Sequence, residues 1–154
     1  MSSRHVIVVG FGLSGRATAN AVEDHNISVA VIETNPETVT RCTRAGLNII
    51  LGDARDPDIL RHAGIDVATD IAVTVPSDEI TLAVVEQARK MNPTAHIIAR
   101  CTFVSGGLEA HRRGANQVVI AEQVVATEFG RVVDSVISSP ASAAPTSVPA
   151  QPKT

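Results

Sequence analysis

The chain has almost no aromatic residues: its 154 residues include three Phe and neither Trp nor Tyr. Surfaces that bind single-stranded nucleic acid stack bases on aromatic side chains, and this chain has too few to build one. It also has no basic tract, and its formal net charge is −3. Both absences argue against nucleic acid as a partner. The core must therefore consist of Val, Ile, Leu and Ala, which is typical of a buried parallel sheet.

Long apolar runs are also absent. No run approaches the roughly 20 residues that a transmembrane helix requires, so we expect no direct insertion into a membrane. The first residues, Met1 to Arg4, lead directly into an apolar run and lack the pattern of a secretory signal peptide. We therefore expect the chain to be cytoplasmic.

Cysteine is scarce as well. Cys42 and Cys101 stand far apart and form neither a Cys-x-x-Cys pair nor a Cys/His metal spacing. They fit small thiols in a reducing compartment better than a redox pair. The five histidines are equally scattered, with no two at the spacing of metal ligands. We expect no metal site.

What the chain does contain is a regular alternation of aliphatic runs and helical patterns. With 44% hydrophobic residues it is long enough for one domain with a proper core. The runs that we predict to be strands are 5–9, 29–33, 48–51, 71–75, 96–100 and 115–120. The predicted helices are 14–23, 36–45, 56–63, 80–91, 105–113 and 122–137. This alternation predicts an α/β fold with right-handed crossovers, a Rossmann-like, doubly wound parallel six-stranded sheet.

The most informative stretch is the glycine-rich turn after the first predicted strand. It reads Gly10-Phe11-Gly12-Leu13-Ser14-Gly15 and leads into a helical pattern. An acid, Glu33, follows after about 20 residues, as the dinucleotide-binding fingerprint requires. In that fingerprint Gly10 permits the tight turn and Gly12 lets the backbone approach a pyrophosphate. Gly15 lets the helix pack closely on the first strand.

A nucleotide at this turn has two predicted groups of partners. The free N–H groups of the first helical turn face its phosphates, helped by the positive end of the helix dipole. The carboxylate of Glu33 accepts hydrogen bonds from the ribose and would repel a 2′-phosphate. NAD(H) or an adenosine phosphate is therefore favoured over NADP(H). Arg16 is equally consistent with a contact to a terminal phosphate and with an exposed helix surface.

Polar residues also follow the later strands, at the edge where ligands bind in such sheets. Asp53 is suited either to bind the amino group of an adenine, with Ala54 letting the ring lie close, or to cap the next helix. The segment 74–78 ends the fourth strand beside the expected ribose and phosphates, and its Ser77 is suited to cap a helix. Arg100 ends the fifth strand, where a phosphate or a carboxylate would pair with it.

The last predicted helix, 122–137, has an apolar stripe larger than the final helix of a small domain needs unless something packs on it. The stripe consists of Val124, Val125, Phe129, Val132, Val133 and Val136. Glu122 faces a cation or a neighbouring subunit, or is a first-turn glutamate favoured by the helix dipole. Beyond the helix the sequence is rich in Ser, Ala and Pro, and we expect a disordered tail over 138–154.

Together these motifs resemble the N-terminal lobe of the RCK family (regulator of K⁺ conductance), also called the KTN or TrkA-N domain. The resemblance covers about Arg4 to Ile137, and Gly-Asp-Ala after the third strand distinguishes this family from most dehydrogenases. The motifs that carry it are the glycine turn with Arg16, Glu33, Gly52-Asp53-Ala54, Thr74-Val75-Pro76-Ser77-Asp78 and Ile97-Ile98-Ala99-Arg100.

The resemblance implies a homodimer, possibly a higher ring, that binds NAD(H), AMP, ADP or ATP and regulates a membrane potassium channel or transporter. The domain would lie at the inner face of the cell membrane, and its last helix would cross to the neighbouring subunit. The implied nucleotide-binding residues are Gly10, Phe11, Gly12, Leu13, Ser14, Gly15, Arg16, Glu33, Thr34, Asp53, Ala54, Thr74, Val75 and Arg100.

Two departures from the family pattern matter. Thr81 stands where many members have Asn, which weakens any prediction of contacts there. The sequence shows no C-terminal lobe after the last helix, so we do not expect the second ligand site of that lobe. A stand-alone small subunit and a part of a membrane transporter both remain open.

Two other functions are compatible with the same glycine-rich turn. A small NAD-dependent oxidoreductase would need a substrate domain and a proton donor. The chain has no Tyr for a Tyr-x-x-x-Lys pair and no His at a strand end in the expected cleft. A dimerisation module with a vacant pocket is the other alternative. We expect a nucleotide-responsive regulatory domain and no catalytic residues.

Overall fold

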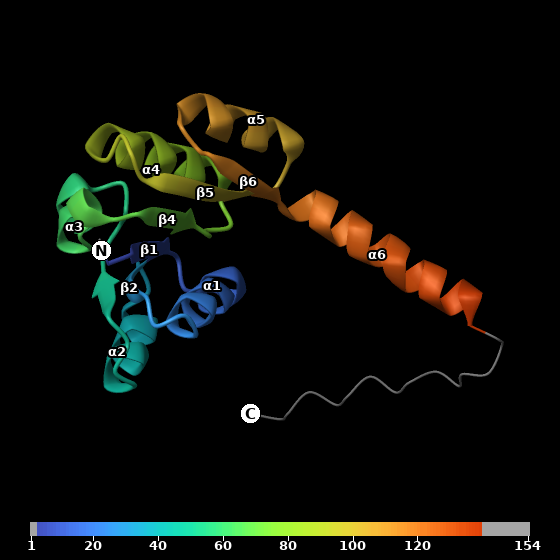
Figure 1. Ribbon diagram of the computed structural model, residues 1–154, viewed down its shortest axis with the longest axis horizontal. Coiled ribbons are helices and arrows are strands. Elements are labelled where there is room, and N and C mark those ends of the chain that lie inside the picture. Colours follow the sequence, from blue (N-terminus) through green and yellow to red (C-terminus); the bar gives the residue numbers. More distant parts are fainter. Residues whose placement is uncertain (1–2, 140–154) are drawn as a thin grey trace.

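The computed structural model describes residues 3–139, which form a six-stranded parallel sheet with helices on both faces (Figure 1). The strand order is β3-β2-β1-β4-β5-β6, and every neighbouring pair is parallel. The order in which the chain adds strands to the sheet reverses between β1 and β4: β2 and β3 lie on one side of β1, and the later strands lie on the other side. The α/β fold and its six strands are confirmed. Of the predicted tail, 138–154, residues 140–154 lie outside the described residues.

The strands are β1 (His5–Val9), β2 (Ser28–Glu33), β3 (Ile49–Leu51), β4 (Asp70–Val73), β5 (His96–Cys101) and β6 (Gln117–Ile120). The helices are α1 (Leu13–Glu23), α2 (Pro36–Arg44), α3 (Pro57–His62), α4 (Asp78–Met91), α5 (Val104–Arg113) and α6 (Ala121–Ser138), with a short 3-10 helix η1 (Ile65–Val67) after α3.

The starts of three helices are fixed by side chains that accept hydrogen bonds from first-turn N–H groups. Asn35 caps α2, Asp56 caps α3 and Ser77 caps α4. In α2 and α3 a proline follows the capping residue directly, where its missing N–H costs nothing. Asp56, and not Asp53, therefore caps the helix after the third strand.

The two faces of the sheet are covered unequally. Helices α3, α4 and α5 pack on one face over a large aliphatic core that includes Ile7, Leu60 and Val85. On the other face α1 and α2 cover a smaller core around Val8 and Val31. The second face is left open over β5 and β6, since α6 leaves the sheet instead of returning across it (Figure 1).

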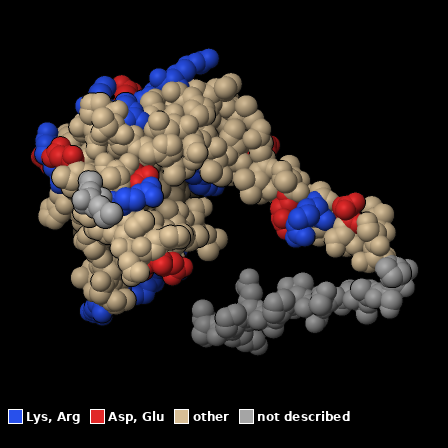
Figure 2. All heavy atoms as spheres, in the orientation of Figure 1, with Lys and Arg blue, Asp and Glu red and all other residues tan. Residues whose placement is uncertain are grey.

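Helix α6 has no buried residue, and its apolar side chains are exposed. Phe129 is 70% exposed and Val125 is 65% exposed. Charged side chains of both signs are scattered over the face of the molecule shown in Figure 2. Within residues 3–139, no helix combines the length and apolar character needed to cross a bilayer.

Candidate functional site

The glycine turn joins β1 to α1, and two of its glycines are required by the local packing. Gly10 has φ +91°, and a Cβ there would lie 2.9 Å from Cγ1 of Val75. A Cβ on Gly15 would lie 2.0 Å from the carbonyl oxygen of Gly10, a distance that no side chain tolerates. The tight turn and the close approach of α1 to β1 therefore both depend on glycine, as the sequence predicts.

Gly12 has a different role, because it faces open space. No atom lies within 4 Å of the position where its Cβ would be. Gly12 is the N-cap of α1 and offers no side chain to the first turn, which also contains no acid. The first N–H groups of a helix have no acceptor within the helix. Those of α1 are therefore available to an anion, which the dipole of this helix favours.

Glu33, the last residue of β2, holds the turn from the other side. Its Oε2 accepts a hydrogen bond from the backbone N–H of Phe11 at 2.8 Å. Its Oε1 accepts one from the backbone N–H of Asn35 at 2.8 Å, and the hydroxyl of Thr34 lies 3.4 Å from the same oxygen. Each carboxylate oxygen has two lone pairs, so Glu33 still has acceptor capacity for a ribose hydroxyl.

Thr74 fixes the turn to the neighbouring strand. It follows β4, and its hydroxyl lies 2.8 Å from the carbonyl oxygen of Val9 and 3.1 Å from that of Gly10, to either of which it donates. Its backbone N–H donates to the carbonyl oxygen of Val9 at 2.9 Å. β1 and β4 thus stay joined at the point where the strand order reverses, which is where ligands bind in sheets of this type.

These elements enclose a cleft of about 400 Å³. Its volume is within the range of small-molecule sites, roughly 300–1,000 Å³. The walls come from the glycine turn, the end of β2, the loop after β3 and the loop after β4. The predicted site residues that line it are Gly10, Phe11, Gly12, Glu33, Thr34, Asp53, Ala54, Thr74 and Val75.

Five predicted site residues do not line this cleft: Leu13, Ser14, Gly15, Arg16 and Arg100. The first four belong to the first turn of α1, directly beside Gly12. The side chain of Arg16 folds back, with its guanidinium carbon 5.6 Å from the centre of the Phe11 ring and Nε 3.4 Å from the Phe11 carbonyl oxygen.

Arg100 faces a different part of the molecule from the one predicted. It lines a hollow of about 470 Å³ between α1 and the start of α6, together with Ser14 and Val124. The reason is the alternation of β5: Ala99 and Cys101 are buried under α4 and α5, so Arg100 between them faces the opposite side. Arg100 keeps one contact with a residue of the cleft: its Nη1 lies 3.4 Å from the carbonyl oxygen of Val75.

Several residues that line the cleft were not predicted from the sequence, above all Arg55. Its guanidinium binds both carboxylate oxygens of Asp53, with the shortest distance 2.6 Å between Nη2 and Oδ2. The hydrogen bonds from Arg55 hold the pKa of Asp53 below its ordinary value, and Asp53 in turn raises the pKa of Arg55. The signal in the sequence was an Arg two residues after the acid. The other lining residues outside the predicted set are Val9, Ile32, Gly52, Pro76, Ser77, Ile80 and Val84, of which Gly52, Pro76 and Ser77 belong to motifs placed at this edge from the sequence.

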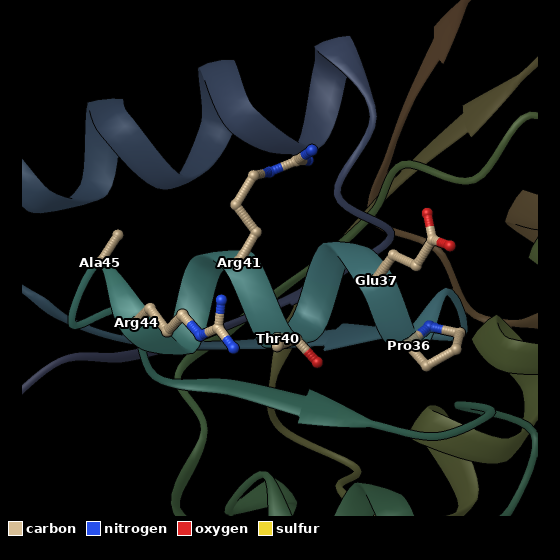
Figure 3. Close-up of a pocket in the computed structure, with 6 residues that line it drawn as sticks. All are labelled: Pro36, Glu37, Thr40, Arg41, Arg44 and Ala45. Carbon is tan, nitrogen blue, oxygen red and sulfur yellow. The ribbon is translucent and has the colours of Figure 1, made fainter.

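A second, wider hollow lies on the surface of α2 (Figure 3). Its volume is about 660 Å³, but all the lining residues come from this one helix and the turn after it, Pro36 to Ala45. Figure 3 shows Arg41 extending from α2 toward α1. Because no polar group from a second element converges on it, we do not regard it as a binding site.

The two thiols and the other metal-binding side chains do not form a site. Cys42 and Cys101 are both buried and unpaired by a disulfide. Burial raises the pKa of the Cys101 thiol, which favours its protonated, unreactive form. Among residues 3–139, no three His, Cys, Asp or Glu side chains gather where they could hold a metal ion.

Sequence and structure comparisons find relatives of this chain. The "Putative cation/proton antiporter YbaL" of Escherichia coli (strain K12) is 31% identical over 122 residues, which are 79% of this chain and 22% of YbaL. The crystal structure of the TrkA-N domain of the E. coli inner membrane protein YbaL has a TM-score of 0.81 and 29% identity, and the match covers 85% of this chain and 97% of that one.

Two more distant proteins with the same fold were solved with nucleotides. The Shewanella denitrificans Kef CTD, in AMP-bound form, has a TM-score of 0.78 and 20% identity over 88% of this chain and 82% of that one. GsuK bound to ADP has a TM-score of 0.76 and 24% identity over 88% and 35% of the two chains. The GsuK channel bound to NAD has a TM-score of 0.69 and 21% identity over 76% and 21%.

The family itself is matched over residues 6–121, which include all six strands and the first five helices. The chain spans only 22% of the length of YbaL, so the match concerns one domain of that larger protein. The glycine turn, the acid after β2 and the strand order agree with this match. The chain belongs to the TrkA-N domain family.

Proposed function

We propose that this domain binds an adenosine nucleotide, either NAD(H) or AMP, ADP or ATP, in the cleft at the ends of β1, β2, β3 and β4. The observation that carries the proposal is the contrast within the glycine turn. Gly10 and Gly15 are needed for packing, whereas Gly12 leaves space for a ligand over a helix N-terminus that has no capping side chain. AMP, ADP and NAD in structures of the same fold support it.

In this proposal the phosphates bind at the first turn of α1, with N–H groups from Gly12 to Gly15 as donors. The ribose hydroxyls bind Glu33 beside Thr34. The adenine lies against Ala54, which is 3% exposed, between the loop after β3 and the loop after β4. Arg16 and Arg100 lie outside the cleft and reach a nucleotide only if their side chains move.

The domain would regulate a potassium channel or transporter, or a related cation/proton antiporter, from the cytoplasmic side of the membrane. YbaL and GsuK, a putative antiporter and a channel in name, support a transport partner. The exposed apolar stripe of α6 and the open face over β5 and β6 support a homodimer, since each copy offers a helix and a bare surface. Ligand-dependent rearrangement of that dimer would then gate ion flux.

The second candidate function is a small NAD-dependent oxidoreductase, because the cleft suits its cofactor equally well. The side chains that line the cleft include no His, Lys, Tyr or Cys, so the evident proton donors are missing from it. Incubation with NADH and a panel of carbonyl compounds distinguishes the two. Saturable binding without turnover supports the regulatory domain, and sustained NADH oxidation would support the enzyme.

A further inference from the structure

Arg55 and Asp53 form an ion pair at the edge of the cleft. The Arg55 guanidinium donates from Nε to both oxygens of Asp53, at 3.1 Å and 3.0 Å, and from Nη2 to Oδ2 at 2.6 Å. The backbone N–H of Arg55 donates to Oδ1 at 2.9 Å. A carboxylate offers about four lone-pair positions. Because the single Nε hydrogen is shared between the two oxygens, Arg55 supplies three N–H groups and occupies most of the hydrogen-bonding capacity of Asp53.

Asp53 is also the acid of the cleft that lies beside the proposed place of the adenine. It lines the cleft next to Ala54, and no other carboxylate of the loop after β3 does so. The 6-amino group of adenine is a neutral donor, whereas the guanidinium makes shorter, charge-assisted hydrogen bonds. The amino group would therefore have to share the Asp53 carboxylate with the guanidinium, which holds both of its oxygens.

We propose that Arg55 sets the base specificity of this cleft by competing with the 6-amino group of a bound adenine for the Asp53 carboxylate. The inference rests on the proposed nucleotide-binding function and concerns the same cleft. In the native sequence the amino group then adds little to affinity, and purine nucleotides with and without it bind almost equally well.

Displacement of the guanidinium is feasible because the pair is not deeply buried. The side chains of Arg55 and Asp53 are 50% and 41% exposed, and exposed ion pairs are weak. The charge of Glu79, in the first turn of α4, adds a smaller contribution to the raised pKa of Arg55. Competition of this strength changes affinity by roughly two- to fivefold.

The test compares AMP with purine riboside 5′-monophosphate, which has a hydrogen in place of the amino group. Isothermal titration calorimetry gives the ratio of their dissociation constants for the native chain and for Arg55→Met, which keeps a straight side chain without donors. We expect Arg55→Met to raise the preference for AMP roughly two- to fivefold. Affinity for the analogue should stay the same.

Two further variants make the result specific. Asp53→Ala combined with Arg55→Met should remove the gained preference, because the side-chain acceptor is gone. Arg61→Met removes a similar ion pair, with Asp58 on α3, that does not line the cleft, and should leave the ratio unchanged.

Three outcomes would overturn the inference. An unchanged or smaller preference for AMP in Arg55→Met would show that Arg55 does not compete with the amino group. Equal weakening of both nucleotides would show that Arg55 supports the ligand instead. If the native chain bound neither nucleotide, the proposed function would fail and the inference with it; binding by the native chain with an unchanged ratio would refute the inference alone.

Discussion

The glycines of the turn differ in what surrounds them, so the same substitution should have different effects at each. Gly15→Ala places a Cβ against the backbone carbonyl of Gly10, which cannot move without opening the turn. We expect a loss of about 1–3 kcal/mol in the free energy of unfolding, as for other overpacked sites. Urea denaturation followed by circular dichroism measures it. Gly12→Ala meets no atom within 4 Å and serves as the control; equal losses in both variants would contradict the packing argument.

Glu33 accepts hydrogen bonds from two backbone N–H groups, and in the proposed complex the same carboxylate also accepts one from a ribose hydroxyl. Glu33→Ala removes the acceptor, and hydrogen bonds to charged groups are worth about 1.5–3 kcal/mol, so AMP should bind roughly ten- to hundredfold more weakly. Calorimetry with AMP and 2′-deoxy-AMP separates the ribose contact from loss of the turn. The native chain should prefer AMP, and Glu33→Ala should bind the two alike. A preference that survives in Glu33→Ala would place the ribose elsewhere.

The pKa of Asp53 reports on its pairing with Arg55. The hydrogen bonds from Arg55 lower it. A group with a lowered folded-state pKa contributes stability above its unfolded pKa, about 4, and loses that contribution as the pH falls through the folded value. Carbon-13 NMR titration should therefore give a midpoint for Asp53 below that of a free Asp. In Arg55→Met the midpoint should rise, whereas Arg61→Met should not change it.

At the scale of helices and strands, local signals in the sequence were sufficient. Most boundaries agree with the prediction within two residues because capping side chains and prolines mark them, as at Asn35 and Asp56. β4 is shorter than predicted, although Thr74 and Val75 continue its apolar pattern. Its neighbour β1 ends at Val9, which pairs with Val73, and Thr74 beyond it bonds through its hydroxyl to the carbonyl oxygens of Val9 and Gly10. The 3-10 helix η1 was not predicted, because its three residues are too few to show a periodic pattern.

The site was predictable where a motif fixes the backbone and less so where a side chain chooses a direction. The roles of Gly10 and Gly15 followed from the fingerprint. The orientation of Arg100 was not predicted. Its position at a strand end suggested the cleft, but the alternation of side chains along β5 turns it toward α1. Arg55 belongs to no periodic pattern, and only the folded loop brings its side chain onto Asp53.

Helix α6 should mediate association of two copies. Phe129→Asp places a charge in the apolar stripe and, if the stripe is an interface, desolvates that charge on association, so the dimer should dissociate. Sedimentation equilibrium measures the change. Thr127→Asp adds the same charge on the opposite side of α6 and should leave association intact. A native chain that is monomeric at all concentrations, or a dimer that tolerates Phe129→Asp, would refute this role of the helix.

For the whole molecule, ligand binding should appear as added thermal stability. A nucleotide at 100 times its dissociation constant stabilises the folded state by about 2.7 kcal/mol. For a chain of this size that raises Tm by roughly 5–10 °C. Thermal-shift titration should show this increase with NAD, NADH, AMP, ADP or ATP and a smaller one with NADP. Gly12→Val, which fills the space where the phosphates would lie, should fold normally and show none.

The unequal covering of the sheet has a consequence for how much of the chain stays ordered. Helices in proteins owe most of their stability to packing of an amphipathic face, and within its own chain α6 buries no residue that would secure it. In the proposed homodimer a neighbouring copy supplies the contacts that its own sheet does not, so order in this segment should depend on protein concentration. Dilution should melt α6 while leaving the proposed nucleotide cleft as it is, because its lining residues come from the first four strands, their loops and α4, and none from α6.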